Sequence, residues 1–162
     1  MVNEHLAVYL NDHLAGSVAA LELIEYLRAA RAGTALEAFF AELHTDVMAD
    51  RQELEALLAR LHIAESRRRK ATAWLAEKAT QLKLQLDDPA GGTLRLLEGL
   101  EALAVGIEGK RGLWQALAAV AEDEPELQEN DYPRLIQRAE EQHRRVEVAW
   151  LQAAKAAFRA TS

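Results

Sequence analysis

Glu140 and His143 have the residue types and the spacing of a pair of metal ligands. They stand three positions apart, which puts both side chains on one face of a helix. In di-iron and di-manganese helical bundles, two helices each supply such a Glu-x-x-His pair and two more each supply a Glu. A second pair is missing from the second helical segment, because Glu42 and His44 are only two positions apart. The sequence therefore supplies one half of a di-metal site.

Other polar residues interrupt the apolar faces of the expected helices. His13 and Ser17 fall within a stripe that includes Leu10 and Leu21, and similar stripes are interrupted further along the chain. When neighbouring helices are folded back on one another, these interruptions come to similar heights. We therefore expect a buried polar layer in the middle of the structure, formed by His13, Ser17, Asp50, Lys78, Arg111 and His143, with Glu140 at its margin.

Two interpretations of this layer stay open. In the first, its charged side chains pair with one another and no cofactor is needed, because a buried charge is stable only when it is paired and hydrogen-bonded. In the second, the layer binds iron or manganese through ligands drawn from Glu140, His143, His13 and Asp50. The positive charges of Arg111 and Lys78 would oppose a metal ion, so we favour the first interpretation.

The composition limits the classes of function. The chain has 162 residues, half of them hydrophobic, so we expect a single domain over residues 1–162. It has no cysteine, which excludes disulfides and thiolate metal sites. The net charge of −7 argues against a nucleic-acid partner. We accordingly interpret the basic run at residues 67–70 as a solvated helix end rather than a phosphate-binding patch.

Location and assembly are less constrained by the sequence. Charged residues break every long apolar stretch, so we expect no contact with a membrane. The N-terminal segment lacks the pattern of a secretion signal, and a cytoplasmic location is the expectation. A homodimer formed through a helix face is an open option, although no pattern marks that face.

The elements that must position these side chains are helical, since Ala, Leu, Glu and Arg dominate the chain. We predict five helices, at residues 4–31, 34–63, 66–86, 93–121 and 131–160. Gly33 is expected to end the first helix, and Thr34 with Glu37 to form a capping box for the second. If the shorter third helix is a crossover, the four long helices run up, down, down and up. This is the ferritin-like arrangement of a four-helix bundle, and a five-helix up-and-down bundle is the alternative.

Three strings of the sequence carry a resemblance to known proteins. YLNDHLAGSVAALEL near the N-terminus, WLAEKATQLKLQL at residues 74–86 and LLEGLEALAVGIEGKRGLWQAL further along resemble a family of uncharacterised bacterial proteins with a ferritin-like fold. The matching segments cover less than half of the chain. The resemblance implies the fold and brings no activity with it.

We conclude from the sequence that a non-enzymatic binding or structural role is the leading hypothesis. In it, an ion-paired polar layer occupies the position where di-iron relatives hold metal. The alternative is a metal-binding oxidase or storage protein.

Overall fold

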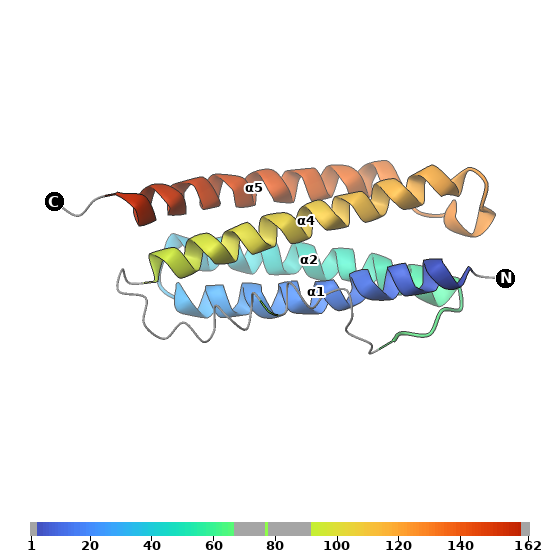
Figure 1. The fold of residues 1–162 in the computed structure, drawn as a ribbon, viewed down its shortest axis with the longest axis horizontal. Coiled ribbons are helices and arrows are strands. Elements are labelled where there is room, and N and C mark those ends of the chain that lie inside the picture. The colour runs from blue at the N-terminus through green and yellow to red at the C-terminus, as the bar shows by residue number, and fades with distance from the viewer. Residues whose placement is uncertain (1–2, 67–76, 78–91, 160–162) are drawn as a thin grey trace.

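The computed structural model describes residues 3–66, 77 and 92–159, and this part of the chain is all-helical, without a β-strand. It contains four long helices, α1 (Glu4–Ala30), α2 (Ala35–Arg60), α4 (Thr93–Ala121) and α5 (Tyr132–Phe158), and the short 3₁₀-helix η1 (Pro125–Leu127) (Figure 1). The all-α prediction is confirmed, and the four long helices begin and end within three residues of their predicted limits. The shorter helix expected at residues 66–86, with Lys78, lies almost entirely outside the described residues.

Local interactions explain where the helices begin and end. Gly33 ends the turn after α1 with a φ of 79°, a conformation that costs glycine little. The predicted capping box of Thr34 and Glu37 at the start of α2 is not formed, because Glu37 bonds one residue before the N-cap and Thr34 gives no side-chain cap. Glu37 accepts a hydrogen bond of 2.8 Å from the N–H of Gly33, whereas the Thr34 hydroxyl donates back to the carbonyl of Arg31. At the start of α5, Asp131 accepts from the N–H of Arg134, which makes Asp131 the N-cap.

Side-chain contacts between helices fix their directions. Tyr26 of α1 accepts a hydrogen bond of 3.1 Å from Arg95 near the start of α4, so these two helices are antiparallel. Asp46 of α2 pairs with Arg145 in the middle of α5, and Glu53 later in α2 pairs with Arg134 early in α5, so these helices are antiparallel as well. The order in the bundle is therefore up, down, down and up, as expected for the long helices (Figure 1).

Two anchors on α1 hold the ends of the connection between α2 and α4. Asn11 donates 3.2 Å to the carbonyl of Ala64 and accepts 2.5 Å from the N–H of Ser66. Near the other end of α1, Arg31 donates 2.6 Å to the carbonyl of Gly92. Because α2 and α4 run in the same direction, these two anchors lie toward opposite ends of α1.

The hydrophobic core falls into two clusters. One contains Phe40, Leu43 and Leu100, and the other contains Leu10, Leu58 and Trp114. On α2 the boundary between them lies at Asp50, since Val47 belongs to the first cluster and Leu54 to the second. On α4 it lies between Ile107 and Leu113 in the same way. Polar side chains therefore occupy a level between two apolar halves. None of the helices in the described ranges is both long and apolar enough to cross a membrane.

Candidate functional site

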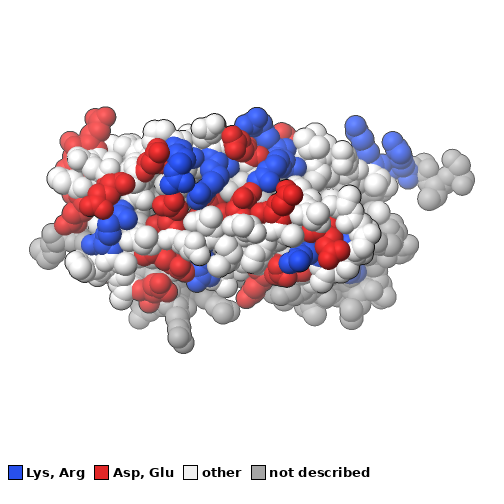
Figure 2. Space-filling model, turned by 180° about the vertical axis from the view of Figure 1, so that it is seen from behind, with Lys and Arg blue, Asp and Glu red and all other residues white. Residues whose placement is uncertain are grey.

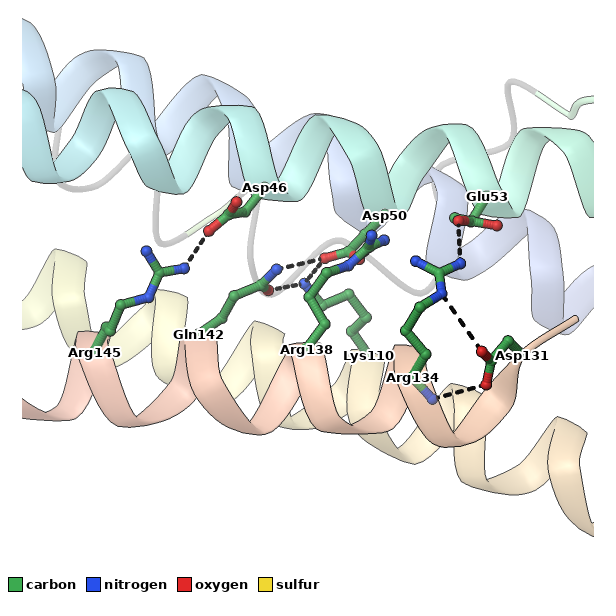
Figure 3. A network of polar contacts seen from close by, with 9 residues as sticks. All are labelled: Asp46, Asp50, Glu53, Lys110, Asp131, Arg134, Arg138, Gln142 and Arg145. Atoms are coloured by element: carbon green, nitrogen blue, oxygen red, sulfur yellow. Dashed lines mark hydrogen bonds and ion pairs between the residues drawn. The ribbon is translucent and has the colours of Figure 1, made fainter.

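Asp50, one of the residues expected in the polar layer, has a side chain that is only 3% exposed and is bound from two other helices. One carboxylate oxygen accepts a hydrogen bond of 2.6 Å from Nε of Arg138. The other accepts 2.8 Å from the amide nitrogen of Gln142 and is also bound by Nζ of Lys110. Lys110 donates in addition to the amide oxygen of Gln142, which closes a ring of three side chains from α2, α4 and α5 (Figure 3).

Exposed ion pairs extend this network along the seam between α2 and α5. Arg145 pairs with Asp46 on one side of Asp50 (Figure 3). On the other side, Arg134 lies 2.7 Å from Glu53 and 3.8 Å from Asp131. Acidic and basic side chains are interspersed along the face opposite to that of Figure 1 (Figure 2). This face therefore presents no large field of a single sign.

The buried part of the network carries more positive than negative charge. Asp50 supplies one carboxylate, while Lys110 and Arg138 supply two cations and Gln142 is neutral. Burial lowers the pKa of Lys110 below its usual value, the attraction and hydrogen bond of Asp50 raise it, and the charge of Arg138 lowers it again. The ammonium of Lys110 is thus held by Asp50 at the cost of its own hydration.

Arg111 and His143 do not occupy the positions expected for them. The guanidinium of Arg111 is partly exposed and bonds to Glu108 at 2.5 to 3.2 Å, with Glu140 at 3.7 Å. Its neighbour Lys110 is the cation inside the bundle. His143 is half-buried, and the preceding residue, Gln142, is the one with no exposure. In both helices the polar residue that enters the interior is the one immediately before the residue expected there.

His13 and Ser17 lie on α1 and do not join the contacts of Asp50 among the described residues. The ring of His13 packs edge-on against Tyr9 with centroids 4.7 Å apart. Burial lowers its pKa, an effect that Asp12 partly opposes, so a neutral imidazole is favoured. The Ser17 hydroxyl donates 2.5 Å to the carbonyl of Leu14. Both residues help to line a pocket instead.

The four candidate metal ligands are not assembled into one set. Both oxygens of Asp50 are bound by cations, and Glu140 faces Arg111. His13 lies on the far wall of the bundle from α5, in the pocket formed by α1, α2 and α4. Within residues 3–66, 77 and 92–159, no group of three or more His, Cys, Asp or Glu side chains is placed to hold a metal ion.

The pocket lies between α1, α2 and α4 and has a volume of about 280 Å³. Most of the described side chains in its wall are apolar, including Ile24, Val47, Leu54, Leu103, Ile107 and Leu113. Lys110 and Asp50 line it where it meets the buried network. Trp114 also lines it, and the buried indole N–H of this residue has no hydrogen-bond acceptor in the described part of the structure. The pocket is thus apolar over most of its wall, with unused donor capacity.

Sequence reasoning missed Lys110, Arg138 and Gln142. A signal for the arginines was present, because Arg134, Arg138 and Arg145 form a basic stripe at helical spacing on α5. The acidic residues Asp46, Asp50 and Glu53 form a matching stripe on α2. Comparing charge stripes between helices would have paired these two faces. For Gln142 no comparable signal exists.

Comparison with protein-family profiles, with curated proteins and with solved structures found no significant match.

Proposed function

We propose that this chain is a non-enzymatic binding protein with a ferritin-like architecture, and that it binds a small, largely apolar molecule between α1, α2 and α4. The observation that carries the proposal is the pocket of about 280 Å³ with its apolar wall. Small-molecule sites are typically concave, mostly apolar and equipped with a few polar groups that fix orientation. The order up, down, down and up, with a long connection between α2 and α4, supports the ferritin-like architecture.

The network around Asp50 supports a role without metal. Its level between two apolar halves is the level where di-iron bundles hold their ions. Here, Lys110 and Arg138 already neutralise the carboxylate. The alternative of a metal-binding oxidase or storage protein requires Asp50 to exchange both cations for a metal ion. No contact among the described residues favours that exchange.

A pair of glycine variants tests the proposed function. Gly109 lines the pocket and Gly112 does not, and a Cβ added at either position meets no atom within 4 Å. We expect 1-octanol to raise the unfolding temperature of the wild type. Gly109→Leu should reduce this effect by placing a side chain at the pocket wall, while Gly112→Leu should preserve it. An equal response of both variants, or no response of the wild type to any apolar probe, would refute the pocket as a binding site.

A further inference from the structure

We propose that the pocket binds a monocarboxylate with an apolar body, and that the carboxylate lies against Lys110 and Trp114. This inference rests on the proposed function, because it assigns a ligand class to the same pocket. It goes further by naming the charge of the ligand, its size and the two side chains that recognise it.

The first argument is the charge of the buried network. Asp50 is the one carboxylate shared by Lys110 and Arg138, which leaves one positive charge in excess. An unbalanced cation away from water is costly, so an anion placed beside it is stabilised. Of the nearby acids, Asp46 also attracts Lys110, but it is engaged with another cation. Asp46 is bound by Arg145, and on the pocket wall Arg51 is paired with Glu55 at 2.6 Å.

Lys110 and Trp114 also offer the pocket N–H donors that the described residues do not use. An ammonium has three N–H donors, and Lys110 uses two of them on Asp50 and Gln142. The buried indole N–H of Trp114 finds no acceptor among the residues that the structure describes. Lys110 and Trp114 stand four residues apart on α4, so their side chains are neighbours on one face, and both line the pocket. A carboxylate has two oxygens and can accept from both.

The third argument concerns size and the number of charges. A cavity of about 150 Å³ is sufficient for benzene, so about 280 Å³ accommodates a body roughly twice as large. The carboxylate of Asp12 also lines the pocket, beside His13. A ligand with a second negative group would be repelled there. The chemistry therefore favours a single carboxylate on an aliphatic or aromatic body of medium size.

Calorimetric titration with octanoate, 1-octanol and octylamine tests this assignment. The three probes share one chain length and differ in the charge of the head group. We expect the wild type to bind octanoate at least tenfold more tightly than 1-octanol, and octylamine least tightly. If octanoate and 1-octanol bind equally, the ligand class is wrong while the proposed function stands. If none of the three binds, both proposals fail.

Two variants locate the carboxylate. Lys110→Met should weaken octanoate at least tenfold and leave 1-octanol within about twofold, whereas Arg111→Met, which changes the neighbouring exposed cation, should alter neither. Trp114→Phe should weaken octanoate severalfold and keeps the proposal testable if Lys110→Met does not fold. Octanoate affinity that is unchanged in both pocket variants would overturn the assignment, since the carboxylate would then bind elsewhere.

Discussion

Lys110 and Arg111 are consecutive cations of α4 in opposite surroundings. Nζ of Lys110 is bound by Asp50 and Gln142 inside the bundle, whereas the guanidinium of Arg111 is bound by Glu108 and Glu140 at the surface. One step along a helix turns a side chain by about 100°, which is enough to separate these two environments. The consequences of that difference can be measured.

Asp50→Ala should destabilise the protein by about 3 to 5 kcal/mol, because it leaves Lys110 and Arg138 without their shared counter-ion. Urea unfolding followed by circular dichroism measures the change. Glu108→Ala removes an exposed partner of Arg111 and should have little effect. Equal losses in the two variants would show that the buried network contributes no more than a surface ion pair.

His13→Leu should preserve or raise stability at neutral pH, because it replaces a half-buried polar ring with an apolar side chain. It should also flatten the dependence of stability on pH. Burial lowers the pKa of His13 in the folded state, so below about pH 6.5 the unfolded chain binds a proton that the folded chain does not. The contribution of His13 is therefore lost as the pH falls from about 6.5 through the lowered pKa. Unfolding of the wild type and the variant at pH 7.5 and 5.0 tests this, and His5→Leu, at an exposed position, is the control.

The same linkage, with the same sign, applies to Lys110 at alkaline pH. Because its folded pKa lies below the usual value, the folded chain releases the proton first, and stability rises as the pH passes from the folded pKa toward about 10.4. Lys110→Met should abolish this rise. The measurement is the unfolding free energy of the wild type and of Lys110→Met from pH 7 to 10, and the difference between the two is compared across that range. A constant difference over that range would contradict the prediction.

Gly109→Ala and Gly112→Ala should each stabilise the protein by up to about 1 kcal/mol, since glycine is a poor helix former and the new methyl meets open space. Gly99→Ala should not follow them. A Cβ there would lie 2.9 Å from both terminal methyls of Leu27, which is itself buried, and the clash should outweigh the gain in helix propensity. Thermal and urea unfolding of the three variants give the ranking. Stabilisation by Gly99→Ala would mean that Leu27 adjusts freely.

Asn11→Ala should destabilise the protein by about 1 to 3 kcal/mol. Its amide bonds to the carbonyl of Ala64 and the N–H of Ser66, and both of these hydrogen bonds are lost in the variant. Amide hydrogen exchange should then accelerate at Ser66. Gln52→Ala on the exposed side of α2 is the control. Unchanged exchange at Ser66 would show that the anchor to α1 does not protect this segment.

The sequence allows much of the fold to be predicted because helix signals are local. The stop at Gly33, the cap at Asp131 and the apolar spacing of the long helices all act within a few residues. Asp50 could also be found, because it is a lone carboxylate on the apolar face of α2. These features need no knowledge of the neighbouring helices.

The rest of the site depends on the phase of α4 and α5, which is not local. Apolar residues surround much of α4, with Val105 and Val120 exposed, so its inner face is poorly defined by hydrophobicity alone. On α5, Gln142 is uncharged and gave no indication of its role. Arg138 reaches the network from the flank of its helix through a long side chain, which a projection onto one face does not capture. The packing of neighbouring helices determines which face of α4 points inward and how Gln142 and Arg138 reach the network.

The shared direction of α1 and α5 determines how this molecule can be joined to others. Because both helices run the same way, the chain enters the bundle at one end and leaves it at the other (Figure 1). A helix of 27 residues is about 40 Å long. Two proteins fused to the two ends would be held apart by about that length, and a direct link between the ends would need a tether of at least about 12 extended residues. The bundle thus sets a fixed separation between whatever is joined to its two ends.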